Sequence, residues 1–192
     1  LFSNNGAALE ADFDLITEGR ESAPIPETVH CMNKERIFLE ADVDIEIGVL
    51  NANKGAIYIG KNAEVQEGAM IRGPFAMGAY SVVKMGTKVY GPTTLGPKSK
   101  IGGEVNNTIL SGYCSKGHDG YLGNSVIGEW CNIGADSNNS NLKNNYANVK
   151  VWDYGQERFM DTGLQFCGLI MADHSKCGIN TMFNTGSVVG VS

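Results

Sequence analysis

Basic residues, proline and cysteine are all scarce in this sequence. Its 192 residues hold 15 Lys and Arg against 21 Asp and Glu, a formal net charge of −6. This acidic balance argues against nucleic acid as the main partner. No stretch approaches the roughly 18 uninterrupted apolar residues of a transmembrane helix, and no signal-peptide pattern opens the chain. We therefore expect a cytoplasmic protein with no membrane partner.

The five cysteines are an odd number and include neither a CxxC pair nor a zinc-ligand spacing. Reduced thiols in a reducing compartment are therefore a better interpretation than a disulfide framework. The three histidines, His30, His118 and His174, also lack the close spacing that brings imidazoles together around one metal ion. We expect no metal site.

Glycine is abundant, and an aliphatic residue or Met recurs at every sixth position through the middle of the chain. The 25 Gly, against five Pro, suit many tight corners that need a positive φ. A period of six fits neither the α-helix nor a long alternating strand. It is typical of a hexapeptide β-solenoid, in which short strands joined by tight bends send every sixth side chain to the same place. The eight positions are Ile59, Val65, Ile71, Met77, Val83, Val89, Leu95 and Ile101.

The pattern continues on both sides with interruptions. An expanded corner at Asn51–Ala56 shifts its phase, and a two-residue shift follows Ile101. An antiparallel sandwich would instead show turn signals about every 8–12 residues. We predict an all-β fold, a parallel β-helix of hexapeptide repeats. The further positions are Leu39, Val43, Ile45 and Val49 upstream, and Ile109, Ser115, Tyr121, Ile127, Ile133, Met171, Cys177, Phe183 and Val189 downstream.

Two segments depart from the repeat. Residues 1–30 form an N-terminal segment with an amphipathic stretch, Ala7–Leu15, and a Pro-containing linker, and residues 31–192 form the β-helix domain. One long loop, about 138–164, protrudes from the helix and contains a predicted hairpin strand at Val149–Trp152. The chain stops at the start of another hexad without the cap that normally covers the end of a solenoid. We expect that its last coils are missing or that a neighbouring chain covers the end.

Function in a repeat scaffold is expected where the repeat is broken. At the break Ser115–Gly123, His118 falls at a corner near glycines. An imidazole there can meet a ligand and exchange a proton near neutral pH, or it can be a surface residue that only closes a turn. The loop 138–164 can line a binding site, grip a neighbouring subunit or be a plain solvated loop.

The residues around this break resemble a known motif. They are similar to the left-handed β-helix acetyltransferase domain of the bifunctional N-acetylglucosamine-1-phosphate uridylyltransferase/glucosamine-1-phosphate acetyltransferase. A later segment, Asp173–Asn180, is closest to sugar-1-phosphate nucleotidylyltransferases with such a tail. The resemblance covers about Ile37 to Ser192, and residues 1–13 look like the end of a nucleotidyltransferase domain whose glycine-rich loop is absent. The matching blocks are His118–Gly123, Asn124–Glu129, Asn132–Ala135 and Asn141-Leu142.

The resemblance implies a homotrimer of left-handed coils with active sites between subunits. It makes His118 the general base that takes a proton as a sugar amine attacks acetyl-CoA. Tyr121 and Asn132 would hold the sugar phosphate. The backbone N–H of Ala135 would face the thioester oxygen, and Asn141 would lie in the same pocket. A fixed backbone donor suits the oxyanion that forms in this attack.

Some positions depart from the family pattern. Asn106 stands where the family has its phosphate-binding lysine, twelve residues before His118. Arg72 is a loose counterpart of the family's upstream arginine, and we include Arg72 and Lys116 among the substrate-binding candidates. Asp119 either orients His118 or is a turn acid. Further cations that could substitute for the lysine are Lys84 and Lys88.

We therefore predict an acetyltransferase domain that takes acetyl-CoA as co-substrate and an amino-sugar phosphate as acceptor. It would belong to a longer sugar-1-phosphate nucleotidylyltransferase of nucleotide-sugar synthesis, in which Mg²⁺ serves only the missing nucleotidyltransferase domain. The alternative is a non-catalytic assembly or regulatory module on such an enzyme.

Overall fold

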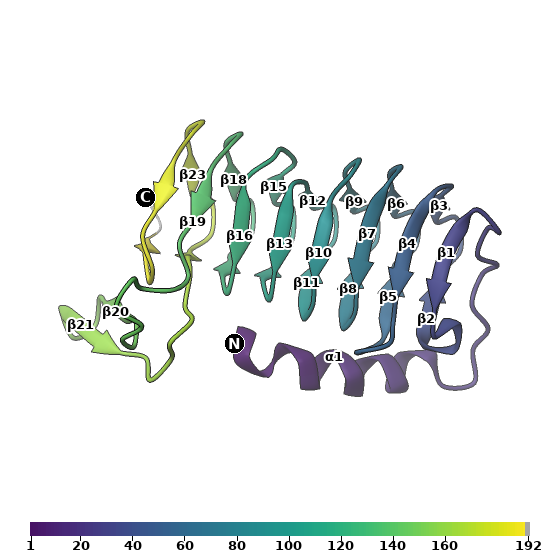
Figure 1. Ribbon diagram of the computed structural model, residues 1–192, viewed down its shortest axis with the longest axis horizontal. Coiled ribbons are helices and arrows are strands. Elements are labelled where there is room, and N and C mark those ends of the chain that lie inside the picture. The colour runs from purple at the N-terminus through teal and green to yellow at the C-terminus, as the bar shows by residue number, and fades with distance from the viewer. Residues whose placement is uncertain (191–192) are drawn as a thin grey trace.

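In a computed structural model that describes residues 1–190, the chain forms a parallel β-solenoid with one helix along its side (Figure 1). Face A holds β1 (Val29–Met32), β4 (Gly48–Asn51), β7 (Ala69–Arg72), β10 (Lys88–Tyr90), β13 (Glu104–Asn106) and β16 (Tyr121–Gly123). Face B holds β2 (Ile37–Leu39), β5 (Ile57–Ile59), β8 (Phe75–Met77), β11 (Thr93–Leu95), β14 (Ile109–Leu110), β17 (Val126–Ile127), β22 (Ile170–Met171) and β25 (Val188–Val189). Face C holds β3 (Asp44–Ile45), β6 (Glu64–Val65), β9 (Val82–Val83), β12 (Lys100–Ile101), β15 (Ser115–Lys116), β18 (Asn132–Ile133) and β23 (Lys176–Cys177).

Each strand pairs in parallel with the strand of the neighbouring coil, so the predicted parallel β-helix is confirmed. Ile59 pairs with Met77 and Met77 with Leu95, which makes one coil three six-residue steps long in this part of the chain. All eight positions of the first six-residue run are buried, with at most 2% of their surface exposed. The apolar interior is therefore continuous from coil to coil. The left-handed sense of the coil stays a prediction from the resemblance.

The predicted register of the second run is wrong by one residue over its first three positions. Ile109, Ser115 and Tyr121 lie on the outer surface, while their neighbours point inward. The inward residues are Leu110, Lys116 and Leu122, each at most 2% exposed. Upstream, Leu50 rather than Val49 points inward. Ile127 and Ile133 are buried as predicted.

Shortened corners explain this register. We name the corners by the faces they join. The inward residues that flank one CA corner, Val83 and Val89, are six positions apart. Those that flank the next CA corner, Ile101 and Val105, are four positions apart, with Gly102, Gly103 and Glu104 between them. The following AB corner is one residue shorter than its predecessor. A period of six therefore fails where corner lengths change, because each lost residue exchanges inward for outward positions in the next strand.

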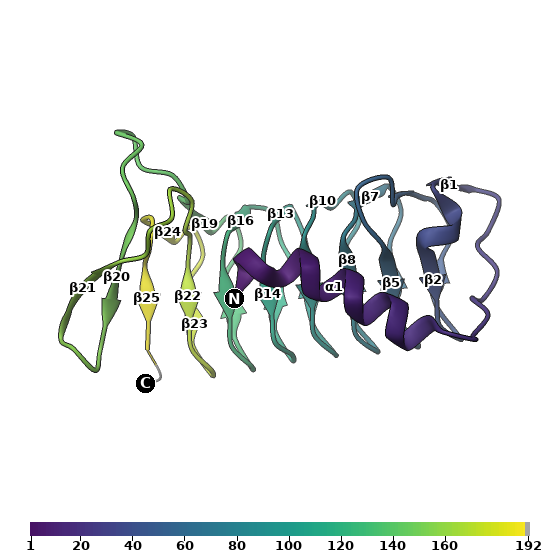
Figure 2. The same ribbon diagram turned by 90° about the horizontal axis from the view of Figure 1, so that it is seen from below.

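The helix α1 (Phe2–Thr17) runs along face B and is longer than the predicted Ala7–Leu15 (Figure 2). Phe2, Leu9 and Phe13 are buried, at the spacing of one helical face. Polar contacts also attach the helix to the solenoid. The Thr94 hydroxyl donates to Asn5 Oδ1 at 2.8 Å, and the Ala56 N–H donates to Glu10 Oε1 at 2.7 Å.

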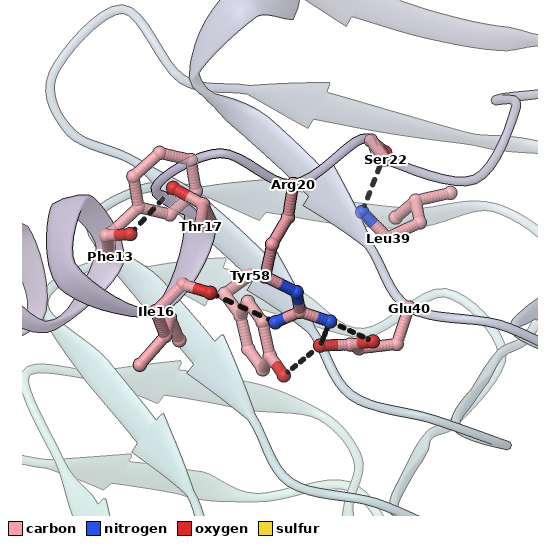
Figure 3. Close-up of polar contacts among 8 residues, drawn as sticks. All are labelled: Phe13, Ile16, Thr17, Arg20, Ser22, Leu39, Glu40 and Tyr58. Carbon is pink, nitrogen blue, oxygen red and sulfur yellow. Dashed lines mark hydrogen bonds and ion pairs between the residues drawn. The ribbon is translucent and has the colours of Figure 1, made fainter.

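The segment after the helix is held by a charged contact (Figure 3). Arg20 donates to both carboxylate oxygens of Glu40 at 2.8 Å, and the Tyr58 hydroxyl donates to Glu40 Oε1 at 2.6 Å. Burial and the neighbouring Glu40 raise the pKa of Tyr58 to about 12, and the bond from Tyr58 lowers the pKa of Glu40. Residues 1–20 therefore pack against the solenoid.

The long loop begins two residues later than predicted. β19 (Asn138–Asn139) still belongs to the solenoid, where it pairs with β24 (Met182–Phe183) and extends face A. The loop then carries an antiparallel hairpin, β20 (Lys150–Asp153) with β21 (Arg158–Asp161), which projects beside the last coils (Figure 1). The predicted hairpin strand is therefore found within one residue of Val149–Trp152.

Within residues 1–190, no helix combines the length and the apolar character needed to span a membrane. Val191 and Ser192, the end of the predicted β-helix domain, lie outside the described residues. A short 3-10 helix, Lys34–Arg36, precedes β2.

Candidate active site at the CA corner

His118 lies at the CA corner that joins β15 to β16, and its side chain is exposed. The backbone there is unusual, because Gly120 has a φ of +118°, which side chains other than glycine rarely adopt. A Cβ at Gly120 would also overlap with the carbonyl of Ser137 in the next coil. Glycine is therefore required next to this corner, and the predicted corner position of His118 is what the structure shows.

Neighbouring coils hold the backbone after His118 from both sides. The Glu104 N–H donates to the carbonyl of Gly120 at 3.2 Å, and the Asp136 N–H donates to that of Asp119 at 3.0 Å. The Asp119 side chain is exposed and makes no hydrogen bond to His118 within the described residues. This geometry favours a turn acid over a group that orients His118 as the interpretation of Asp119.

Ala135 occupies the same corner one coil further along. Its carbonyl accepts from the Asn180 N–H at 2.8 Å, whereas its own N–H donates to no acceptor in residues 1–190. The structure thus brings His118 and an unpaired Ala135 N–H to successive levels of one corner. A general base and a backbone donor are the two groups that acyl transfer from a thioester uses.

Tyr121 lies on the outer surface of face A, directly after the corner. A Cβ at Gly123 would overlap with the Tyr121 ring, so the Tyr-Leu-Gly order lets the ring lie over the glycine. Asn141 Nδ2 donates to the Tyr121 hydroxyl oxygen at 2.8 Å. The structure therefore joins Tyr121 and Asn141, two of the predicted site residues, although twenty residues separate them.

Two asparagines support this pair and were not among the predicted site residues. Asn124, buried and with a φ of +50°, accepts from Asn141 Nδ2 at 2.7 Å. Asn139 points inward, accepts from the Gly123 N–H at 2.8 Å and donates back to the Gly123 carbonyl at 3.0 Å. An Asn at an inward position of the repeat is the signal that could have identified Asn139.

Neither Asn132 nor Arg72 lies beside the pair formed by Tyr121 and Asn141. Asn132 is exposed on face C, between Ser115 and Lys176 in the ladder, so it approaches the CA corner from the other side. Arg72 lies on face A three strands from Tyr121, a separation of about 14 Å at normal strand spacing. Its guanidinium stacks over the Tyr90 ring at 5.7 Å beside a separate groove of about 250 Å³.

Lys116 does not reach the surface, which contradicts its placement among the substrate-binding candidates. Its side chain is 2% exposed, and its Nζ donates to the carbonyls of Gly102 at 2.8 Å and His118 at 2.9 Å. A phosphate would have to open the coil to meet this ammonium. The physical reason is the one-residue register difference, which turns Lys116 inward and Ser115 outward.

The outer surface around Tyr121 is poor in positive charge. In the preceding strand, the ladder neighbour of Tyr121 is Glu104. In the next coil, the side-chain oxygen of Asn138 accepts a hydrogen bond from the Tyr121 N–H. Asn106 lies between Tyr90 and Gly123 and carries no charge. Lys88 pairs with Glu104 and is therefore two strands from Tyr121. The departure at Asn106 is thus not compensated by a lysine in an adjacent strand.

His174 lies at a different corner, where faces B and C meet. Its ring is parallel to that of Trp130, with centroids 6.4 Å apart, and Trp130 stacks on Tyr113 at 4.3 Å. No three His, Cys, Asp or Glu side chains of residues 1–190 lie close enough to hold a metal ion. The five cysteines are unpaired, and burial raises the pKa of Cys131 to about 11.

Comparison with known proteins identifies a relative of part of this chain. A bifunctional sugar-1-phosphate nucleotidylyltransferase/acetyltransferase of Sulfurisphaera tokodaii is 31% identical over 139 residues, which are 71% of this chain and 34% of that protein. The chain therefore spans about a third of the length of the curated relative that it matches. No family model matches the sequence.

Proposed function

We propose, from the fit of this sequence and solenoid to a β-helix acetyltransferase domain, that the chain transfers an acetyl group from acetyl-CoA to the amine of an amino-sugar phosphate. The transfer would be one activity of a longer sugar-1-phosphate nucleotidylyltransferase. The observation that carries the proposal is the CA corner, where an exposed His118 stands one coil from the unpaired Ala135 N–H.

The chemistry follows from these two groups. The amine nitrogen attacks the thioester carbonyl carbon, and the carbonyl oxygen becomes an oxyanion that the Ala135 N–H stabilises. His118 takes the proton that the nitrogen loses. When the C–S bond breaks, the imidazolium returns this proton to the coenzyme A thiolate, so the amide and the thiol are the products and His118 is restored.

The other predicted residues would bind substrate. The Tyr121 hydroxyl already accepts from Asn141, so its own proton is free to donate to a sugar oxygen. Asn132 would contact the acceptor from face C. Arg72 is too far from Tyr121 to bind the same sugar ring within one chain.

A homotrimer would bring such separated groups together. In this arrangement the CA corner of one copy faces a surface of the next, so that a cation from a second copy supplies the charge missing at Asn106. Arg72, exposed on face A, is the cation that we assign to this role.

Two single substitutions test the proposal in the longest natural form of the protein. His118→Ala should lower kcat for coenzyme A release by about 10²–10⁴-fold with glucosamine 1-phosphate as acceptor, because a general base is lost. His174→Ala removes another exposed corner imidazole and should leave kcat within twofold. Equal rates for His118→Ala and the wild-type protein would contradict the proposal.

The second candidate function is a non-catalytic assembly or regulatory module. The observation that favours it is the absence of a lysine or arginine in the strands adjacent to Tyr121, in the part of the chain that the structure describes. This function predicts that calorimetry detects no binding of acetyl-CoA to the longest natural form of the protein. Binding in the micromolar range would exclude it.

A further inference from the structure

We infer that Lys116 is a positioning residue for His118, because its side chain holds the backbone of that histidine from inside the coil. The inference rests on the proposed role of His118 as general base. It assigns a use to a buried amine that the acetyl transfer itself does not touch.

Lys116 replaces an aliphatic residue in the inward column of face C. Ile101 precedes it by one coil and Ile133 follows it, and both are buried. A buried ammonium is costly unless hydrogen bonds replace the lost water. The lysine therefore needs acceptors inside the coil. The other inward residues of this column are Ile45, Val65, Val83 and Cys177.

Both acceptors of Lys116 are corner carbonyls. One belongs to Gly102, in the coil before, at 2.8 Å, and the other belongs to His118 at 2.9 Å. The side chain therefore ties the corner of one coil to the corner of the next. Hydrogen bonds to a charged donor are stronger than those between neutral groups, so this link is a firm one.

The surrounding sequence makes room for this link. The preceding CA corner is the shortened one, which brings the Gly102 carbonyl to the lysine. Other CA corners have a residue with a side chain, Thr87 or Ser137, two positions before the inward residue of face A. The His118 corner has Gly120 at the equivalent position. Two local departures from the repeat thus accompany the inward lysine, and both lie at the corner that carries His118.

The three consecutive carbonyls of this corner are each held by one donor. Backbone N–H groups of neighbouring coils hold the carbonyls of Asp119 and Gly120. The carbonyl of His118 is held by the Lys116 side chain. Removal of the ammonium therefore frees the one residue of the corner that carries the imidazole.

Two substitutions at Lys116 remove the link while preserving the apolar column. Lys116→Met keeps the length of the side chain, and Lys116→Ile copies the residues of the adjacent coils and serves if the first variant folds poorly. The matched control is Ile133→Met, an inward substitution on the same face that removes no donor.

The decisive readout does not depend on activity. Deuterium exchange of the peptide 115–122 should become at least about tenfold faster in either Lys116 variant than in Ile133→Met. In the same proteins, kcat for acetyl transfer to glucosamine 1-phosphate should fall by about tenfold to a hundredfold, since small misplacements of a catalytic group have effects of this size. KM for both substrates should stay within twofold.

The outcomes separate this inference from the proposed function. Unchanged exchange in both Lys116 variants would overturn the inference, and so would faster exchange with an unchanged kcat. A wild-type protein without acetyl transfer would refute the proposed function and, with it, the catalytic half of the inference. Faster exchange together with a lower kcat and constant KM supports both.

Discussion

At the scale of single residues, the proton on Lys116 makes folding depend on pH. Burial lowers the pKa of Lys116 to about 8, although Asp119 and Asp136 oppose the shift. A neutral amine still has two N–H donors, which match its two carbonyl acceptors. Between about pH 8 and the ordinary lysine pKa near 10.4, the unfolded chain therefore binds more protons than the folded one, and stability rises with pH.

We predict that the free energy of unfolding of the wild-type protein gains up to about 3 kcal/mol relative to Lys116→Met between pH 7 and pH 11. The difference between the two proteins cancels the titration of other groups. Urea denaturation at each pH measures it. A constant difference across this range would show that Lys116 keeps an ordinary pKa.

Gly123 gives a second prediction at this scale. A Cβ there would overlap with the Tyr121 ring, which would have to leave its place over the glycine and lose the bond from Asn141. We expect Gly123→Ala to destabilise the fold by about 1–3 kcal/mol, as overpacking does. We also expect a higher KM for the sugar phosphate with an unchanged KM for acetyl-CoA.

Thermal unfolding and steady-state kinetics on the same preparation check both expectations. The control is Gly155→Ala, in the turn of the exposed hairpin, where an added Cβ meets only the tip of Asp153. If Gly123→Ala behaved like this control, the Tyr121 ring would not depend on the glycine.

The sequence predicts the positions of some candidate residues well and of others poorly, and the difference lies in the corners. His118 was predictable because a histidine among glycines interrupts a strict repeat. Lys116 was misplaced because two corners before it lose residues, and a period of six alone does not show where the loss occurs. The contact between Tyr121 and Asn141 depends on how the long loop leaves the solenoid, which no local pattern specifies.

At the scale of elements, successive coils place large side chains at the BC corner, namely Tyr80, Lys98, Tyr113, Trp130 and His174. Each of these five corner residues has a φ between +53° and +60°, a conformation that bulky residues rarely adopt. Lys98 Nζ lies 5.9 Å and 5.7 Å from the ring centroids of Tyr80 and Tyr113, and the stack continues through Trp130 to His174. We attribute the tolerance of this backbone to stacking between coils.

A double-mutant cycle at Tyr113 and Trp130 tests this attribution. The rings are 4.3 Å apart and within 8° of parallel, so we expect a coupling energy of about 0.5–1.5 kcal/mol in thermal or urea unfolding. A cycle between Trp130 and Tyr58, which lies under the helix on face B, should give a value near zero. Equal couplings in the two cycles would contradict the stacking argument.

The elements themselves were predictable to different degrees. The eight inward positions from Ile59 to Ile101 were identified from the period alone, because burial selects aliphatic residues there. The position of α1 was not, because an amphipathic pattern shows that a helix has a buried face but not which surface covers it. Contacts distant in sequence, such as Ala56 to Glu10, decide that question.

At the scale of the whole molecule, the proposed homotrimer must form by contacts between solenoids. Exposed apolar side chains lie at the CA corner itself, including Ile47, Met85 and Ile179, which are 54%, 68% and 71% exposed. We predict that light scattering after size-exclusion chromatography gives three times the chain mass. Met85→Lys should weaken the trimer, because it places a charge in an apolar contact.

The matched control for that experiment is Lys61→Met, an exposed position at the BC corner, which should leave the mass unchanged. If the wild-type protein is a monomer at micromolar concentration, the active site cannot lie between subunits. Arg72 then cannot contact the sugar phosphate bound at the CA corner.

The most direct measurement follows the transferred group itself. The longest natural form of the protein is mixed with isotopically labelled acetyl-CoA and glucosamine 1-phosphate, and mass spectrometry follows the sugar. We expect a labelled N-acetyl sugar phosphate that forms with catalytic turnover and is lost in His118→Ala but not in His174→Ala. Unlabelled sugar after full incubation, or equal labelling with both variants, would contradict this expectation.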